Sequence, residues 1–287
     1  MDLNRKCKDF WGLNPAATPF GKHMEDEGGM FVWPAFEDVV EKIVHVIKHR
    51  SFLVMSGEAC SCKTAAWSHA KRLLVEESIA PKFSQPMGLN PSKYNESTIY
   101  HAIVYSIAPP DGSAQSAFKR TREDRAHQCR QLLEAQNARQ VPVVLAVNDA
   151  HDCQLAFLKM CKRLWDDLYG FDRLLSVILI GHPSLLAMAR SCKEIDERME
   201  IVEMPDLGDS LEDYLAFEFN RCGSESMPIT PDGVARLGSI VKRHPLLINN
   251  VVSRALFEGF RIKADAIDAR LIERAASAER GAEGGAK

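Results

Sequence analysis

The residues of this sequence with the clearest chemical potential form one short segment, GEACSCKT at residues 57–64. It follows the apolar run at residues 52–55 and precedes a stretch with helical spacing, so it joins a buried strand to the start of a helix. The phosphate-loop pattern G-x-x-x-x-G-K-[ST] occupies the same context, where a curled backbone directs its N–H groups at phosphates. We therefore predict that these residues bind a nucleotide, with Lys63 on the β- and γ-phosphates and the Thr64 hydroxyl on Mg²⁺. The predicted phosphate-binding set is Gly57, Glu58, Ala59, Cys60, Ser61, Cys62, Lys63 and Thr64.

Two cysteines depart from this pattern. Cys62 stands where glycine is expected, and Cys60 occupies a place where glycine is common. Glycine suits both places because the backbone approaches the phosphates closely and a Cβ atom can collide with them. Two interpretations stay open: the cysteines are tolerated in a working site, or the Cys62 side chain excludes the nucleotide. A Cys60–Cys62 disulfide would also block the site, but a reducing compartment disfavours it.

A second polar pair, Asn148 and Asp149, follows the strongest strand of the sequence at residues 141–147. In phosphate-loop enzymes an Asp at this place holds Mg²⁺, and a neighbouring group positions the attacking water. When the pair is aligned with the family pattern in one register, Asn148 occupies the metal-binding position and Asp149 the position of the base. In the other, Asp149 serves the metal and no base remains. Both registers predict slow hydrolysis of ATP.

Two single residues complete the predicted catalytic set. His182 follows the strand at 174–180, where a polar side chain is well placed to sense a γ-phosphate. Arg198 precedes the strand at 199–204 and is a candidate arginine finger for the nucleotide site of a neighbouring subunit. The alternatives are a structural histidine at a strand end and a solvated surface charge.

The composition is that of an ordinary folded protein, with 46% hydrophobic and 26% charged residues, which excludes a mostly disordered chain. The net charge of −3 does not by itself indicate nucleic-acid binding, although a local basic patch is compatible with it. We expect a cytoplasmic protein, because no apolar run reaches membrane-spanning length and the start lacks the apolar core of a signal peptide. The eight cysteines contain no CxxC pair, so we expect reduced thiols and no structural zinc.

Strands alternate with helices up to residue 205, and only helices follow. The pattern predicts strands at 52–55, 141–147, 174–180 and 199–204, with a weaker one within 80–91. It predicts helices at 36–49, 63–77, 99–107, 117–140 and 154–168, and then at 209–221, 231–242, 246–261 and 264–277. This order predicts an α/β fold: a P-loop core with a parallel sheet flanked by helices (36–205), then a small all-helical lid (206–277). Residues 1–35 are predicted to be an extended segment packing on the core, and residues 278–287 a disordered tail.

Together these segments resemble the ExeA-type branch of the AAA+ ATPases, which includes transposition regulators of the TnsC, TniB and Mu B kind. The resemblance runs over about residues 8–275 and depends most on GHPSL at 181–185 and HPLLINN at 244–250. It implies an AAA+ core with a helical lid, ATP and Mg²⁺ as ligands, and ATP-dependent rings or filaments. It also implies binding of double-stranded DNA and recruitment or stimulation of a transposase. Many relatives carry a second-sensor Arg where this sequence has Leu246 and Leu247; Arg243 and Arg254 are the possible substitutes.

The richest basic stretch lies around Lys119, Arg120 and Arg122. Because relatives bind DNA through loops on the ATPase core, we predict that residues 113–122 contact DNA phosphates, a type of contact that needs no sequence motif. The alternative is a solvated helical face, since acidic residues are interspersed with the basic ones.

Two other functions stay open. Cys60, Cys62 and Asn148 are compatible with a hydrolysis-impaired or nucleotide-free AAA+ scaffold. Secretion proteins of the ExeA type are the third possibility. Those proteins follow the ATPase with a membrane segment and a peptidoglycan-binding module, which this sequence does not contain, so transposition is the expectation.

Overall fold

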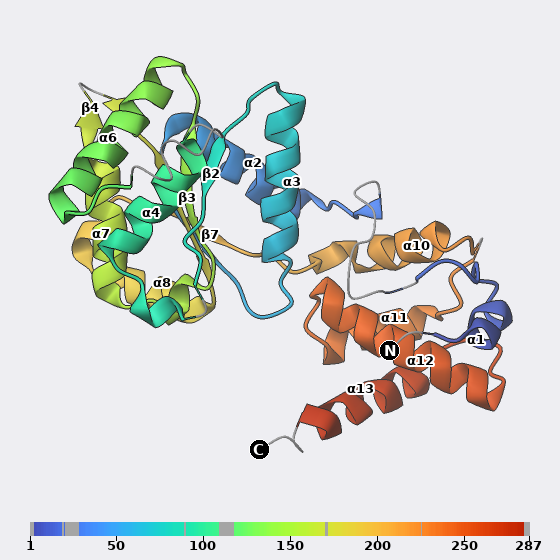
Figure 1. The fold of residues 1–287 in the computed structure, drawn as a ribbon. Coiled ribbons are helices and arrows are strands. Elements are labelled where there is room, and N and C mark those ends of the chain that lie inside the picture. The colour runs from blue at the N-terminus through green and yellow to red at the C-terminus, as the bar shows by residue number, and fades with distance from the viewer. Residues whose placement is uncertain are drawn as a thin grey trace. The chain divides into compact units, whose positions relative to one another are not determined.

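The polypeptide forms an α/β unit and a helical unit, seen here in a computed structural model (Figure 1). The α/β unit contains Phe36–Ala59 and Lys63–Met204, and the helical unit contains Met1–Ala35, Cys60–Cys62 and Pro205–Lys287. The structure describes residues 3–18, 20, 29–88, 90–108, 118–169, 172–224 and 226–283.

The α/β unit is built on a five-stranded parallel sheet with the strand order β2-β3-β6-β1-β7. The strands are β1 (Phe52–Ser56), β2 (Lys82–Ser84), β3 (Val143–Val147), β6 (Ser176–Gly181) and β7 (Glu200–Glu203). The three central strands β1, β3 and β6 are buried along their whole length, which explains why they appear in the sequence as uninterrupted apolar runs. The parallel sheet confirms the predicted α/β class.

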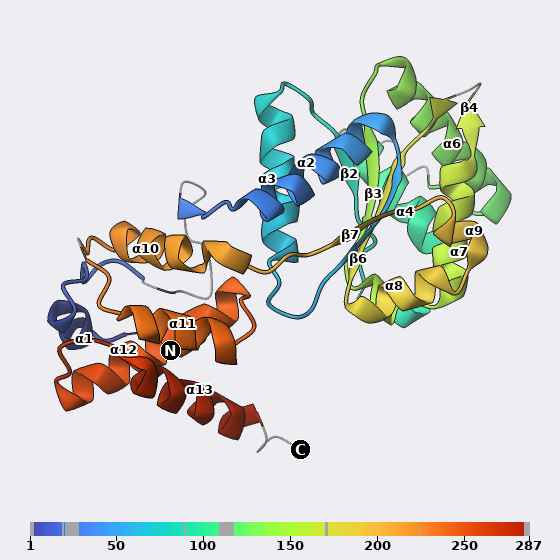
Figure 2. The ribbon, with the colours of Figure 1, turned by 180° about the vertical axis from the view of Figure 1, so that it is seen from behind.

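Helices cover both faces of this sheet (Figures 1 and 2). On one face, alternate residues of β1, β3 and β6 pack with apolar side chains of α4 (Glu96–Ile107), α6 (Arg122–Ala138), α7 (Leu155–Asp166), α8 (Pro183–Arg190) and α9 (Lys193–Asp196). The other face is covered by α2 (Pro34–His49) and α3 (Lys63–Glu76). Because side chains alternate along a strand, each central strand contributes to both cores.

Several short elements lie outside the predicted pattern. These are α8 and α9, the two-residue strands β4 (Leu168–Tyr169) and β5 (Asp172–Arg173), and the 3₁₀ turns η2 (Pro91–Lys93) and η3 (Ala150–Asp152). They are too short for a periodic apolar pattern to reveal them. Both η3 and α8 follow the carboxyl ends of central strands, where they shape the candidate site.

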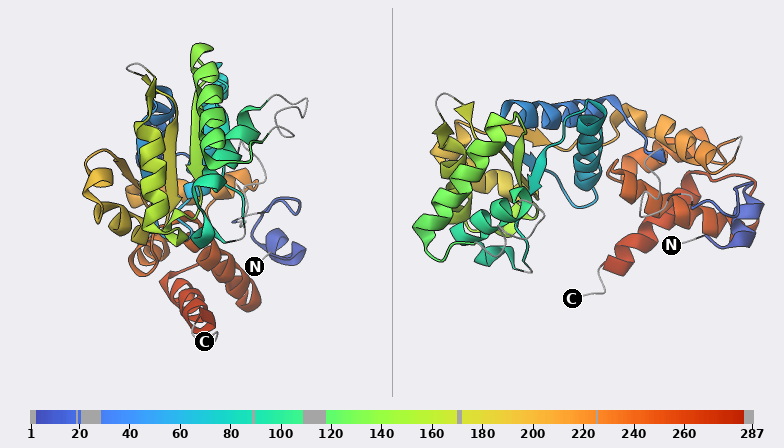
Figure 3. Two further views of the ribbon diagram at one scale, coloured as in Figure 1. Left: turned by 60° about the vertical axis from the view of Figure 1, so that its left-hand side comes forward. Right: turned by 45° about the horizontal axis from the view of Figure 1, so that its top comes forward.

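After residue 205 the described part of the helical unit contains η4 (Gly208–Ser210), α10 (Leu211–Arg221), α11 (Pro231–Ile240), α12 (Pro245–Ile262) and α13 (Ala269–Glu283). In it α13 packs against both α11 and α12 (Figure 3). Thr230 accepts a hydrogen bond from the Gly233 amide at the start of α11, and Pro245 opens α12, two signals that fix where these helices begin. The last helix continues to Glu283, so the predicted tail is helical for most of its length; residues 284–287 lie outside the described part.

The N-terminal segment differs from its prediction. Instead of being an extended segment that packs on the core, it contains α1 (Arg5–Phe10) and packs within the helical unit. The Trp11 indole N–H donates to the Leu256 carbonyl at 2.8 Å, and the ring lies against Gly259, where an added Cβ would be 2.8 Å from Trp11 Cζ2. A buried indole needs both an apolar surface and an acceptor, and α12 supplies both.

In the described part of the chain, none of the helices has the length and apolar character that crossing a bilayer requires.

Candidate active site

The predicted phosphate loop lies between β1, which ends at Ser56, and α3, which begins at Lys63. Its first amide, Gly57 N–H, donates to the Gly181 carbonyl at the end of β6 at 3.1 Å. The Lys63 ammonium turns back into the loop and donates to the carbonyls of Gly57 at 2.7 Å and Glu58 at 2.6 Å. A positive charge is thereby placed against the loop backbone, on the lysine that reaches the β- and γ-phosphates in the phosphate-loop motif.

The two cysteines of the loop hold the backbone conformation that glycine favours. Cys60 has φ +67° and Cys62 has φ +62°. A residue with a Cβ atom pays about 1–2 kcal/mol for the left-handed region, whereas glycine enters it readily. The loop backbone thus has the positive φ that glycine favours at both positions, although the sequence has cysteine there. The contribution of each loop residue to nucleotide binding remains a prediction.

The carboxyl ends of the central strands bring the other predicted residues to this same edge of the sheet. Ser56 of β1 is in register with Gly181 of β6, and Val147 of β3 is in register with Leu179 of β6. The residues that follow these strands, Asn148, Asp149 and His182, are all exposed at that edge. Asp149 takes the left-handed conformation (φ 51°, ψ 36°), so the chain turns sharply into η3 directly after the strand. The proposed metal, base and sensor groups therefore share one edge with the phosphate loop.

The structure adds a residue to this edge that the sequence analysis missed. The His151 ring, in η3, lies 5.9 Å from the His182 ring between centroids. It packs against Gly181, because a Cβ built there would come within 3.2 Å of His151 N and Nδ1. His151 Nδ1 is buried and makes no hydrogen bond to any described residue. The only sequence signal for it was its place two residues after Asp149, and only the turn at Asp149 brings it toward β6.

Tyr94 anchors the segment that faces η3. Its hydroxyl donates to the carbonyls of Gly88 at 3.1 Å and Pro86 at 3.4 Å. Burial, with the nearby Cys153 and Asp149, raises the pKa of the Tyr94 phenol above its usual value. Tyr94 is therefore a neutral hydrogen-bond donor at pH 7, and it ties Pro86 and Gly88 to the end of η2, which contacts η3.

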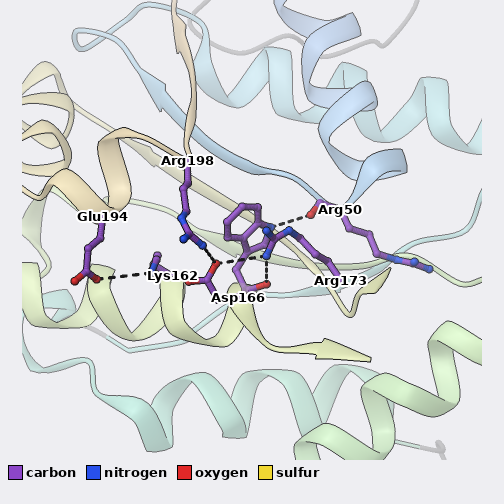
Figure 4. A network of polar contacts seen from close by, with 7 residues as sticks. Arg50, Lys162, Asp166, Arg173, Glu194 and Arg198 are labelled. Carbon is purple, nitrogen blue, oxygen red and sulfur yellow. Dashed lines mark hydrogen bonds and ion pairs between the residues drawn. The ribbon is translucent and has the colours of Figure 1, made fainter. Parts of the chain in front are cut away.

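Arg198 lies at the opposite edge of the sheet. Since β7 is parallel to β1, with Glu200 in register with Leu53, a residue that precedes β7 is at the amino edge. There the Arg198 Nη1 donates to Asp166 Oδ1 at 2.8 Å (Figure 4). The length of a strand separates this guanidinium from its own phosphate loop, roughly 15 Å at 3.3 Å per residue. A role for Arg198 in nucleotide binding is therefore open only toward another subunit.

The predicted DNA-binding residues lie at the start of α6. Lys119 and Arg120 are exposed, and the Arg125 guanidinium holds their backbone by donating to the carbonyls of Lys119 at 2.7 Å and Arg120 at 3.0 Å. The third residue, Arg122, forms an ion pair with Glu96, so its charge is already partly compensated. The predicted loop at 113–122 is described only from residue 118 onward.

The two candidate second-sensor residues differ in their contacts. Arg243 donates to the carbonyls of Gly208 at 2.7 Å and Gly238 at 3.2 Å, so its guanidinium connects two turns of the helical unit. Arg254 lies in the middle of α12 and is half-buried. A second-sensor role for either residue remains a prediction.

Comparison with known proteins decides the family. The AAA domain family matches residues 45–188, half of the 287-residue chain, including the phosphate loop and the strands β1, β3 and β6. The chain belongs to the AAA+ family. Its fold is therefore that of a nucleotide-binding ATPase. A search among curated proteins found no match.

Solved structures agree on the fold. The Cdc6p crystal structure from Pyrobaculum aerophilum is similar with a TM-score of 0.58 at 14% identity, over 86% of this chain and 67% of that chain. The ORC2 protein of Aeropyrum pernix, in its ADPNP–ADP complexes, has a TM-score of 0.59 at 10% identity, over 90% and 70%. The ORC1 protein of the same organism, in complex with DNA, has a TM-score of 0.55 at 12% identity, over 88% and 67%. At these identities the likeness concerns the AAA+ fold, and the ExeA-type branch remains a prediction.

Proposed function

We propose that this AAA+ protein binds ATP with Mg²⁺ through residues 57–64, assembles on duplex DNA, and regulates DNA transposition by recruiting or stimulating a transposase. The observation that carries the proposal is the loop itself, where the Lys63 ammonium lies against two main-chain carbonyls between a buried strand and a helix. Support for the transposition role comes from the sequence resemblance at residues 181–185 and 244–250.

The residues at the carboxyl edge of the sheet fit an ATP-binding site. Lys63 would hold the phosphates and Thr64 would hold Mg²⁺, which neutralises phosphate charge when it is bound. Asp149 is the best candidate to orient the attacking water, and His182, with His151 beside it, would sense the γ-phosphate. With Asn148 at the metal position the site lacks an acid there, and with Asp149 at the metal position it lacks a base, so we expect hydrolysis to be slow in either register.

The DNA-binding part of the proposal is supported by Lys119 and Arg120. Both are exposed at the start of α6, and neither has an ion-pair partner among the described residues. Arg125 fixes their backbone, so two positive side chains project from an ordered segment. Lys and Arg side chains of this kind bind DNA phosphates without regard to sequence.

The first experiment measures ATP turnover and ATP binding with and without duplex DNA. The unmodified protein is compared with Lys63→Ala, which removes the phosphate-binding charge, and with Asn148→Asp, which restores an acid next to Asp149. We expect slow, DNA-stimulated turnover that Lys63→Ala abolishes and Asn148→Asp increases. Absence of ATP binding in the unmodified protein would contradict the proposal.

The second experiment tests the DNA contact through its salt dependence. Lys119→Ala/Arg120→Ala should lower the slope of log K against log salt by about two, since each lost phosphate contact contributes about one. Lys159→Ala/Arg163→Ala on α7 removes the same charge from another exposed surface and serves as the matched control. An equal loss in both variants would assign the effect to net charge rather than to this segment.

One alternative has a specific observation in its favour. Asn148 at the metal position and the cysteines at positions 60 and 62 fit a scaffold that keeps the AAA+ shape with little or no hydrolysis. ATP binding or turnover that appears only in the Cys60→Gly/Cys62→Gly variant would establish this alternative.

A further inference from the structure

Asp166, the last residue of α7, is the centre of a charged cluster at the amino edge of the sheet (Figure 4). Its Oδ2 accepts from Lys162 Nζ at 2.6 Å, and its Oδ1 accepts from Arg198 Nη1 at 2.8 Å. Arg173 Nη1 lies 3.5 Å from the same Oδ1. Burial alone would raise the pKa of Asp166, but Lys162 and Arg198 together bring the pKa below its usual value. The carboxylate is therefore an ionised acceptor shared by three cations.

The surroundings of Asp166 hold it in a fixed place. The Arg173 guanidinium stacks over the Trp165 ring, with 3.4 Å from its central carbon to the ring centroid, and donates to the Trp165 carbonyl at 2.9 Å. The Trp165 indole in turn donates to the Arg50 carbonyl at 2.8 Å. Lys162 is only 12% exposed, so it serves as an internal counter-ion. Lys162 and Arg173 thus contact the carboxylate directly, and the bond from Trp165 to Arg50 fixes the end of α7 that carries it.

Arg198 is held differently from the other two cations. Its side chain is 51% exposed, against 29% for Arg173 and 12% for Lys162. Lys162 also lies 3.6 Å from Glu194, so the cluster has three positive and two negative groups. The cluster therefore carries one positive charge in excess, and Arg198 is its most exposed cation. This is the arrangement expected of an arginine presented to an anionic group.

We propose that Asp166 is the positioning residue for Arg198, and that it holds the guanidinium ready for the nucleotide phosphates bound by a second copy of this chain. The inference rests on the assembly in the proposed function and on the predicted role of Arg198 as an arginine finger for a neighbour's site. Asp166 does not touch the nucleotide itself. It reduces the number of conformations that a long, exposed arginine must give up when the neighbouring subunit arrives.

The experiment measures ATP-dependent assembly by sedimentation velocity, together with ATP affinity at a protein concentration that keeps the chain monomeric. Asp166→Asn keeps the shape of the side chain and removes its charge. We expect it to raise the protein concentration for half-assembly about tenfold, as loss of a charge-assisted hydrogen bond predicts, with ATP affinity unchanged. Arg198→Ala should have an equal or larger effect. The control Glu197→Gln neutralises the adjacent acid, which pairs with Lys193 and not with this cluster.

The double variant Asp166→Asn/Arg198→Ala separates positioning from general stabilisation. If Asp166 acts through Arg198, the double variant assembles no worse than Arg198→Ala alone. Additive losses, or an Asp166→Asn protein that assembles as well as the unmodified one or better, would overturn the inference while leaving the finger role of Arg198 intact. An Arg198→Ala protein with unchanged assembly would overturn both the finger role and this inference.

Discussion

Replacing Cys62 by glycine and by alanine tests the shape of the phosphate loop. The backbone at Cys62 has φ +62°, and an L-residue pays about 1–2 kcal/mol there that glycine does not. Glycine carries an opposing cost of about 0.5–1 kcal/mol, because it gains freedom in the unfolded chain. The difference predicts that Cys62→Gly is more stable than Cys62→Ala by about 0.5–1 kcal/mol.

At an ordinary helical position alanine is more stabilising than glycine, which is the reverse of the order expected at position 62. A helical position nearby therefore provides the control. Ala65 lies in the first turn of α3, three residues further along. There a glycine should destabilise the protein by about 0.5–1 kcal/mol relative to alanine. Chemical denaturation of Cys62→Gly, Cys62→Ala, Ala65→Gly and the unmodified protein measures the glycine–alanine difference in stability at both positions under one set of conditions. If Cys62→Ala is as stable as Cys62→Gly, the loop does not hold a positive φ at this residue, and the expected advantage of glycine there is refuted.

The same pair of variants also locates any obstruction of the nucleotide. If the Cβ atom at position 62 collides with phosphate, Cys62→Gly binds ATP more tightly than either the cysteine or the alanine protein. If the sulfur alone is responsible, alanine and glycine bind equally well and both bind better than cysteine. Equal affinity in all three proteins would show that the loop accommodates a side chain at this position.

Three further predictions concern the candidate site, the Asp166 cluster and the predicted DNA-binding segment. Gly181→Ala would place a Cβ 2.9 Å from Leu185 Cδ2 and 3.2 Å from His151 N. It should therefore destabilise the protein by about 1–3 kcal/mol, measured by thermal denaturation. An unchanged stability would contradict the packing of His151 on β6. Because the pKa of Asp166 is lower in the folded chain, its stabilising effect is present above its unfolded-state pKa and is lost as pH falls through the lowered value. Asp166→Asn should therefore flatten the acid limb of a stability–pH curve. Arg125→Lys cannot keep both bonds to the carbonyls of residues 119 and 120, and faster amide exchange at 118–121 with weaker DNA binding should follow.

The central strands and the phosphate loop were predictable because their signals are local. β1, β3 and β6 are buried on both faces, so they appear as apolar runs whose limits depend on nearby turn residues. The motif at 57–64 also includes its own context, a strand before it and a helix after it. The sequence likewise indicated where helices alone begin after residue 205, since a change in periodicity needs no knowledge of tertiary contacts.

The missed features depend on contacts between distant segments. The approach of His151 to His182 requires a left-handed Asp149 and the pairing of β3 with β6, neither of which a local pattern contains. The Asp166 cluster joins α7, β5 and the turn before β7, and each of its residues looks like a solvated charge on its own. The N-terminal aromatic residues indicated packing, but only the tertiary structure shows that their partner is α12.

The predicted site residues lie at two opposite edges of the sheet, and this determines how two copies of the chain must meet in the proposed assembly. In a parallel sheet, every residue that follows a strand lies at one edge and every residue that precedes a strand lies at the other, so the phosphate loop and Arg198 cannot meet within one subunit. On the proposed function they meet only when the amino edge of one copy faces the carboxyl edge of the next. Such a head-to-tail interface closes into a ring or continues as a filament. Nucleotide binding and assembly must then strengthen each other by the same factor. An assembly that depends on bound ATP is lost when ATP is hydrolysed, so the slow hydrolysis expected from Asn148 would lengthen the life of the assembly on DNA without preventing its formation.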